Sequence, residues 1–561
     1  MTRRHAPTIL LVLISVAIVI PRLLFSTCIN EFGTDGGYYT DIALNLAAGN
    51  GLTTDVSIFH QAFPYFPFPT PVYPLWPSLY GAAAVLFPVR FVGVWLPTLL
   101  YFVLIGLSFV VGRRLAPRLA LEGLHGGHVF AVVTALTSEL MRSTSRPYTE
   151  GLGYTLLFLL FVRAPTLFRR LGPVAGLELG AWIIAVFLTR SQLIVVGIAA
   201  VGAVLVAAWR RPRASATFTL AAAGLVTVVW QIYAAWLATF LANPSLGTYV
   251  RFDLARASDL LSAVPVLVQT NGPLARLKDI ASGFVVAFTL RDEPSSYYHL
   301  HHALINTLPI AALVLLVRVR RARVLFRFLR SAWAPNAAFF LLSALGLLGS
   351  LHTVHKVYGL AWTFGDRHAL SSLFLVVTAT LFLLRSRSWL RIVGALLFAA
   401  GTYEGWREMV LQTERQCIAA SHNIGLLDYR RQLREFLQKE RERRGSLTVA
   451  AQRPEAQRLG WRTPGVGFHW LTHTTTVDDL SAMVNVLGVR YVVLFDAVKD
   501  PFAGNADFAA HFTLATTFKE RGIDEDGNVT KARHTRVYAP LCSAFPTLAP
   551  GDCVVVAAPA P

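Results

Sequence analysis

The sequence predicts an all-α polytopic membrane protein that carries a C-terminal α/β domain. Of its 561 residues, 54% are hydrophobic and only 15% are charged, and no soluble protein of this length needs so many long apolar runs. These runs recur through residues 8–403, after which apolar density drops and charge rises. Arginines recur in alternate loops between the runs, which is the pattern of a multi-pass protein with a fixed orientation.

Hydropathy predicts about eleven membrane-spanning helices of roughly 15–24 residues. The first span follows Arg3 and Arg4, and no small-residue cleavage site comes after it, so we interpret it as a retained helix. The Pro- and aromatic-rich piece 73–88 is predicted to be a surface or re-entrant helix, because counting it as a span inverts every later loop. The predicted spans are 8–25, 90–112, 125–141, 151–168, 175–189, 192–209, 214–237, 303–317, 333–350, 370–384 and 389–403.

The basic loops predict which parts face away from the cytoplasm. They alternate in step with the basic N-terminus, which places loop 26–89, loop 238–302 and the region from 404 onward outside. The net charge of +19 is therefore mostly a topology signal, and no nucleic-acid partner is predicted. All four cysteines fall on the outer side, an oxidising compartment in a bacterium. Cys542 with Cys553 is the local choice among three pairings, and free thiols are left open.

Two domains are predicted, a membrane domain over residues 1–403 and an extracytoplasmic α/β domain over 404–561. The second is indicated by helical patterns and β-like runs that follow one another. The helical patterns are 426–444 and 477–487, and the β-like runs are 446–450, 491–495, 535–538 and 553–556. The second domain contains no nucleotide fingerprint and no catalytic motif.

Charged residues gather at the predicted outer ends of the spans. Asp35 opens a helical pattern that Gly49 closes, Glu150 begins the fourth span, and Arg190 lies in a tight hairpin between two spans. Each has a plain structural interpretation: Asp35 as a helix N-cap, Glu150 as a first-turn acid favoured by the helix dipole, and Arg190 as an interfacial anchor. A further charged stretch, 356–368, precedes the tenth span.

Together, carboxylates and cations at one membrane face suit group transfer from an anionic lipid carrier. A carboxylate can take the proton of an attacking hydroxyl, and cations can hold a phosphate leaving group. The chain resembles GT-C membrane glycosyltransferases, in the group of protein O-mannosyltransferases, the aminoarabinose transferase of lipid A and Rgt-type transferases. The resemblance covers residues 1–400, and its motifs are Thr34-Asp-Gly-Gly-Tyr-Tyr39, Ala43-Leu-Asn-Leu-Ala-Ala-Gly-Asn-Gly51, Ser145-Arg-Pro-Tyr-Thr-Glu150, Thr189-Arg190 and Gly365-Asp-Arg-His368.

This resemblance implies a GT-C fold and an inverting hexosyl- or pentosyltransferase with a polyprenyl-phosphate-linked sugar as donor. The acceptor would be a hydroxyl of an envelope glycan, lipid or protein at the outer face of the cell (inner) membrane. The catalytic residues fall on Asp35, as the base, and on Glu150, as a second acid that orients the acceptor or helps the base. Four residues are assigned to the donor phosphate, namely Arg190, Lys356, Arg367 and His368. Four tyrosines are assigned to the substrate cavity, namely Tyr38, Tyr39, Tyr297 and Tyr298.

No metal ligand and no certain cofactor are assigned, and a divalent cation is left open. The family often has a second acid directly after the first, but Gly36 stands at that position, which weakens the case for a metal held by adjacent acids.

Two other functions fit a chain of this kind. A lipid or sugar transporter or flippase would also have many spans, but it should place ionisable groups near mid-membrane, often in broken helices. Here the charges collect at the outer ends, which favours an enzyme. A non-catalytic assembly protein would use its external tail to bind a partner and would leave Asp35 and Glu150 unimportant.

Overall fold

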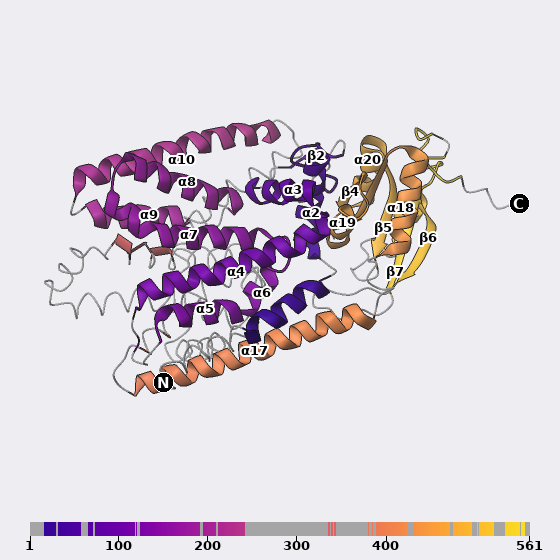
Figure 1. Cartoon of the computed structure of the whole chain (residues 1–561). Coiled ribbons are helices and arrows are strands. Elements are labelled where there is room, and N and C mark those ends of the chain that lie inside the picture. Colours follow the sequence, from indigo (N-terminus) through magenta and orange to yellow (C-terminus); the bar gives the residue numbers. More distant parts are fainter. Residues whose placement is uncertain are drawn as a thin grey trace, which may run out of the picture.

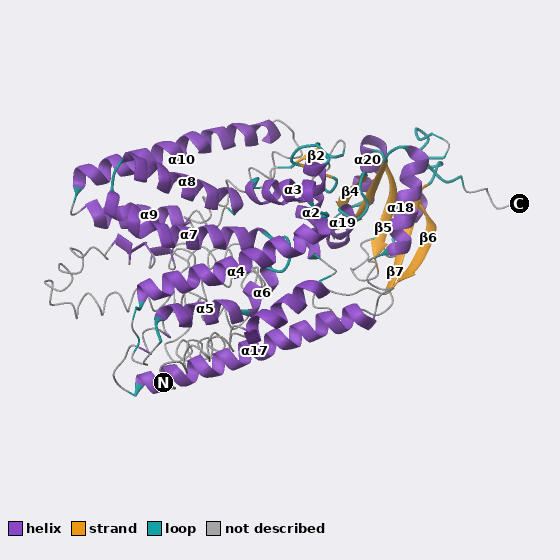
Figure 2. Cartoon of the chain, in the orientation of Figure 1, coloured by secondary structure: helices purple, strands orange, loops and turns teal. Residues whose placement is uncertain are grey.

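The computed structural model of the chain contains a bundle of apolar helices and a mixed β-sheet (Figures 1 and 2). It describes residues 16–29, 32–57, 66–70, 73–117, 119, 124–190, 195–208, 211–241, 335–336, 338–339, 342–343, 380, 384, 389–422, 430–471, 475–495, 502, 504–520, 533–549 and 551–555. The predicted spans 303–317, 333–350 and 370–384 lie wholly or mostly outside these residues.

Long helices lie side by side in the bundle (Figure 1). Among the described residues, three are long and apolar enough to cross a membrane: Val89–Leu115, Thr149–Arg170 and Pro212–Trp236. Shorter apolar helices include Val16–Cys28 and Pro173–Thr189. The bundle helices are α4 (Val89–Leu115), α5 (Gly126–Leu136), α6 (Ser138–Ser143), α7 (Thr149–Arg170), α8 (Pro173–Thr189), α9 (Val195–Ala208), α10 (Pro212–Leu241) and α17 (Leu390–His422).

Two of the predicted spans differ from the observed helices. The predicted span 125–141 is wrong as a single helix, because the chain leaves the helical conformation at Thr137 (φ −72°, ψ 111°) and restarts as α6. The Thr137 hydroxyl bonds back to the carbonyl of Val133 at that point (2.7 Å). The span predicted at 389–403 is the start of a 33-residue helix, α17, that continues to His422.

A layer of short elements lies between the bundle and the sheet, at what we call the sheet end of the bundle (Figure 1). It consists of α2 (Gly33–Ala47), β1 (Thr53–Thr54), β2 (Phe68–Pro69) and α3 (Leu75–Leu86). The helix α3 falls within the piece 73–88, where a surface or re-entrant helix was predicted. The short strands β1 and β2 pair antiparallel. All these elements belong to the first predicted outer loop.

The C-terminal part forms a five-stranded sheet of order β4-β3-β5-β7-β6. Its first three strands are parallel, and β7 and β6 add antiparallel. The strands are β3 (Leu447–Gln452), β4 (Val466–Leu471), β5 (Val489–Phe495), β6 (Phe512–Glu520) and β7 (Arg533–Pro540). The helices are α18 (Arg431–Arg444), α19 (Arg453–Gly460), α20 (Val477–Leu487) and α21 (Ala506–His511).

Part of this α/β fold was predicted from the helical and β-like patterns. Strands β3, β5 and β7 and helices α18 and α20 lie where they were expected, whereas β4 and β6 were missed. The run predicted at 553–556 is not a strand, because Val554 makes only an isolated bridge to Leu541.

The four cysteines form two disulfides. Cys28, at the end of the first described helix, joins Cys417 of α17, and Cys542 joins Cys553. The local pairing expected from the sequence is therefore confirmed. The first helix and α17 also meet through Thr413, whose hydroxyl donates to the Pro21 carbonyl (3.3 Å). This fixes the start of the bundle to the helix that leads into the C-terminal part.

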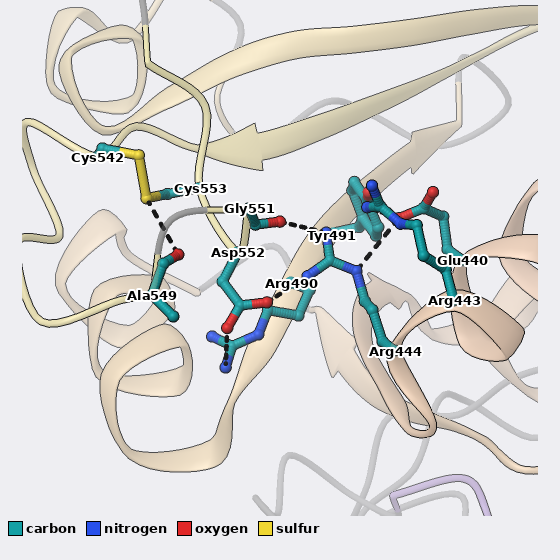
Figure 3. Close-up of polar contacts among 10 residues, drawn as sticks. All are labelled: Glu440, Arg443, Arg444, Arg490, Tyr491, Cys542, Ala549, Gly551, Asp552 and Cys553. Carbon is teal, nitrogen blue, oxygen red and sulfur yellow. Dashed lines mark hydrogen bonds and ion pairs between the residues drawn. A yellow bond between two sulfur atoms is a disulfide. The ribbon is translucent and has the colours of Figure 1, made fainter.

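The end of the chain is held to the sheet by a charge cluster beside the Cys542–Cys553 disulfide (Figure 3). Arg444 of α18 pairs with Asp552 and donates to the Gly551 carbonyl (2.8 Å). Arg490 pairs with the same carboxylate (3.2 Å), and Tyr491 donates to Glu440 of α18 (2.6 Å). Because each member has partners within the cluster, it serves to fasten α18 and the last described residues to β5.

Candidate functional site

Asp35 lies in the first turn of α2, at the sheet end of the bundle. The helix begins at Gly33 with Phe32 as its N-cap, so the interpretation of Asp35 as an N-cap is wrong. At this position the carboxylate still interacts favourably with the helix dipole. The side chain is half-buried. Gly49, which has φ +85°, follows the end of α2 as expected, because a left-handed residue after a helix is usually glycine.

The two tyrosines assigned to the cavity lie further along α2. Tyr38 is buried, and its hydroxyl shares a hydrogen bond with the Thr70 hydroxyl (2.6 Å). Burial raises the pKa of Tyr38 well above its usual value. Tyr39 is half-buried beside it, with their ring centroids 6.0 Å apart. Tyr38 is therefore part of the packing beneath α2.

The segment before Glu150 is buried and held from several sides. The Trp76 indole of α3 donates to the Pro147 carbonyl (2.9 Å). A Cβ on Gly36 would lie 3.2 Å from the Tyr148 ring and 3.3 Å from Pro147, so the residue after Asp35 contacts this segment directly. The first turn of α2 therefore packs against the residues that lead into Glu150.

Glu150 and Arg190 form an ion pair at the same end of the bundle. Glu150 is in the first turn of α7, and Arg190 is the C-cap of α8. Their side chains are only 3% and 14% exposed. The Thr149 hydroxyl donates to the second carboxylate oxygen of Glu150 (3.3 Å). A buried pair of this kind fixes both side chains, because separating them would leave a charge without water or a counter-ion.

The structure thus brings the elements that carry Asp35, Glu150 and Arg190 to one end of the bundle. The other residues assigned to the site, Lys356, Arg367, His368, Tyr297 and Tyr298, lie outside the described residues. Within the described residues, no group of three or more His, Cys, Asp or Glu side chains could hold a metal ion.

A buried carboxylate pair beside the site was missed. Asp41 of α2 accepts hydrogen bonds from the Thr54 hydroxyl (2.7 Å) and from the Asp55 backbone N–H (2.8 Å). Asp55 accepts from the Gly465 N–H in the C-terminal part (3.3 Å). The helical spacing carried the signal, because Asp41 shares a face of α2 with Tyr38, three residues before it, and with Leu44, three residues after it. An acid on an apolar face is a candidate for burial.

The environment of this pair favours its protonated form. Burial, and after it the charge of Asp55, raises the pKa of Asp41 to about 8, although the hydrogen bonds from Thr54 and Asp55 act in the opposite direction. Burial also raises the pKa of Asp55, while its hydrogen bonds and the positive charge of Arg441 lower it. Burial therefore keeps the neutral form of Asp41 favoured to a higher pH than for an aspartic acid in water.

We expect the free energy of unfolding to fall as the pH rises from about 4 to about 8. In that window the unfolded chain releases the Asp41 proton and the folded chain keeps it, so unfolding is favoured by higher pH. Asp41→Asn imitates the neutral acid and should flatten the dependence. The measurement is the thermal midpoint of the purified protein in detergent across this window. Parallel curves for the two proteins would contradict the assignment.

Arg22 was also missed, although it is fully buried in the first described helix. Its guanidinium donates to the carbonyls of Met141 (2.9 Å) and Thr144 (2.7 Å), and it lies over the Tyr101 ring. These carbonyls end α6, just before the segment that leads to Glu150. A cation suits the C-terminal end of a helix, so Arg22 fixes where that segment starts.

Comparison with known proteins gives limited similarity. No family model matches the sequence, and no curated protein matches it significantly. Among solved structures, the archaeal oligosaccharyltransferase AglB from Archaeoglobus fulgidus, in complex with an inhibitory peptide and a dolichol-phosphate, is 13% identical with a TM-score of 0.45, over 86% of this chain and 69% of that one. ArnT from Cupriavidus metallidurans, bound to undecaprenyl phosphate, is 13% identical with a TM-score of 0.43, over 95% of this chain and 98% of that one.

Both of these structures are GT-C glycosyltransferases, and ArnT is an aminoarabinose transferase. The group named from the sequence motifs is thus represented among the similar structures. Since both TM-scores are below 0.5, neither similarity assigns a donor, an acceptor or a catalytic residue to this chain.

Proposed function

We propose that this protein is a membrane glycosyltransferase that moves a sugar from a polyprenyl-phosphate-linked donor to an acceptor hydroxyl. The observation that carries the proposal is that α2, which bears Asp35, packs against the segment before Glu150, whose side chain pairs with Arg190, at one end of an apolar helix bundle. A half-buried carboxylate and a buried, acid-paired arginine are the groups needed to deprotonate a hydroxyl and to bind a phosphate.

In the proposed reaction, the acceptor oxygen attacks the anomeric carbon of the sugar. Asp35 takes the proton of the acceptor hydroxyl, the carbon–oxygen bond to the phosphate breaks, and the polyprenyl phosphate leaves with the bonding electrons. Attack from the side opposite the phosphate inverts the configuration. A phosphate leaves without needing a proton from a general acid, so one base and nearby cations are enough.

Arg190 is the described residue suited to the phosphate. Its planar guanidinium presents several N–H donors, so it can keep its bond to Glu150 while donating to a phosphate oxygen. In this arrangement Glu150 orients Arg190 and keeps it from turning away when the site is empty. Lys356, Arg367 and His368 are proposed as further phosphate ligands from the resemblance alone.

The resemblance also supports the outer face of the cell membrane as the place of the reaction. The disulfide between Cys28 and Cys417, which lies at the end of two helices, agrees with an oxidising compartment on that side. A hydroxyl of a glycan, lipid or protein of the envelope would then be the acceptor.

Labelled substrate tests the proposal. Purified protein is incubated with polyprenyl-phosphate sugars that carry a radiolabel, together with separated glycan, lipid and protein fractions of the envelope. We expect one fraction to gain label and free polyprenyl phosphate to appear in equal amount. Movement of labelled donor across vesicles without transfer to any fraction would indicate a flippase and overturn the proposal.

A further inference from the structure

The apolar core of the C-terminal sheet does not end at the sheet. Tyr38 and Ile42 of α2 are buried in the same cluster as Phe468 of β4 and Leu459 of α19. Val56, which follows β1, is fully buried there as well. Domains that merely touch keep separate cores. The shared core means that the first outer loop and the C-terminal part fold as one unit.

Backbone pairing joins the same two parts. Phe468 of β4 donates to the Asp55 carbonyl (2.7 Å), and Ser57 donates to the Phe468 carbonyl (2.8 Å). The Trp470 N–H donates to the Ser57 hydroxyl (2.9 Å). Within the described sheet, β4 is an edge strand, and an open edge readily pairs with another segment. Residues 55–57 occupy that edge.

Glycines lie where α19 approaches α2 and the segment after β1. A Cβ on Gly37 would lie 2.5 Å from the backbone carbonyl oxygen of Gln457, and a Cβ on Gly460 would collide with a methyl group of Val56. Next to them, the rings of Phe32 and Trp461 stack with centroids 5.1 Å apart. Neither Gly37 nor Gly460 has room for a methyl group. A side chain at Gly37 has to push α2 from α19, and one at Gly460 has to push α19 from Val56.

The start of α2 is therefore held between the helix bundle on one side and α19 of the C-terminal part on the other. Gly36 faces the segment before Glu150, and Gly37 faces α19. Asp35 immediately precedes both. A shift of α2 away from either side would move the Asp35 carboxylate relative to Glu150 and Arg190.

We propose that the C-terminal part positions the catalytic base, with Gly37, Gly460 and Trp461 as positioning residues for Asp35. This role rests on the proposed function, because it concerns the base of that reaction. It assigns to α19 and β4 the task of setting the distance between Asp35 and the acceptor hydroxyl. A displacement of about 1 Å at such a distance can lower a rate on the order of a hundredfold.

Glycine-to-alanine variants test the fit. Gly460→Ala should lower kcat by about 10- to 100-fold with little change in the donor KM, because the base moves and the phosphate site does not. Val56→Ala removes the methyl group that the new Cβ would strike, so the double variant should regain most of the lost kcat. Gly37→Ala should act like Gly460→Ala, without rescue by Val56→Ala, because its obstacle is backbone.

Two control glycines lie in α4 and α10. Gly106 and Gly224 have nothing within 4 Å of an added Cβ, and alanine is favoured over glycine inside a helix by about 1 kcal/mol. Gly106→Ala and Gly224→Ala should therefore keep full activity. If Gly460→Ala behaved like these controls, the positioning role would be overturned.

A second measurement does not depend on activity. Hydrogen exchange of the Ser57 and Phe468 amides reports whether the loop stays paired with β4. We expect faster exchange in Gly460→Ala and recovery in Gly460→Ala/Val56→Ala. Faster exchange with unchanged kcat would overturn the positioning role alone. If the wild-type protein transfers no sugar while the variants show these exchange changes, the transferase assignment and the positioning role are both overturned, and only a structural contact is left.

Discussion

Replacing Asp35 by Asn is expected to lower the transfer rate by about a hundredfold or more, with expression unchanged. Asparagine keeps the size of the side chain but cannot accept the acceptor's proton. Through the helix dipole alone a first-turn acid contributes about 0.3–1 kcal/mol, and the half-buried Asp35 side chain is close in size to asparagine. The measurement is the initial rate with labelled donor, beside the thermal midpoint of each protein.

Asp478 provides a matched control. It is an exposed acid in the first turn of α20, in the C-terminal part of the chain. Asp478→Asn removes the same charge from an equivalent place in a helix and should leave the rate unchanged. Wild-type turnover in Asp35→Asn would rule out Asp35 as the base, whatever the control does.

Breaking the Glu150–Arg190 pair should have the largest effect on stability. Removing one member of a buried pair costs about 3–5 kcal/mol, because the other charge is left without a partner. We therefore expect Glu150→Gln and Arg190→Gln each to lower the free energy of unfolding by several kcal/mol. The double variant should lose less than the sum of the two, and the difference is the coupling energy of the pair.

The same helices contain a control pair. Arg163 of α7 and Glu178 of α8 form an ion pair whose side chains are 41% and 34% exposed. A half-exposed pair leaves less uncompensated charge when it is broken than a buried pair does, so the equivalent variants there should have smaller effects. Similar losses at both pairs would indicate that burial does not strengthen the Glu150–Arg190 interaction, in contradiction to the structure.

Arg190→Lys separates a phosphate ligand from an interfacial anchor. Lysine keeps the charge but lacks the planar fork that can serve a carboxylate and a phosphate together. Donor use should therefore recover only in part relative to Arg190→Gln. A lysine extends to a membrane interface as well as an arginine does, so full activity in Arg190→Lys would show that Arg190 only anchors α8.

Hydropathy was sufficient to predict α4, α7, α8 and α10, because a membrane-spanning helix is one continuous apolar run in the sequence. The sheet was harder to predict. Strand β4 is buried along its whole length, so it lacks the alternation that marks a half-buried strand, and Gly467 and His469 interrupt its apolar run. Strand β6 is rich in threonine, so polar residues occur on both of its faces.

For the candidate site, membrane sidedness could predict which charged residues lie at the same end of the helices, but not which of them touch. Sidedness grouped Asp35, Glu150 and Arg190, and the motifs gave them roles. The pairing of Glu150 with Arg190 was not visible, because it depends on how α7 and α8 pack. The surroundings of Asp41 were harder to predict. Its neighbour Asp55 accepts a hydrogen bond from Gly465, which lies 410 positions further along the chain. No local pattern reports such a contact.

The pairing of residues 55–57 with β4 has a consequence for how the protein is made. A ribosome adds about 5–20 residues per second, so the edge strand follows the loop by roughly 20–80 s. Throughout that interval the helix that carries Asp35 has been synthesised but lacks the partner that holds it. A chain that stops before residue 466 would contain the predicted spans and the proposed base, yet it should transfer sugar at least about 10- to 100-fold more slowly than the whole chain. If the proposed function holds, incomplete copies of this protein are expected to lack normal activity until β4 has been synthesised and has paired with residues 55–57.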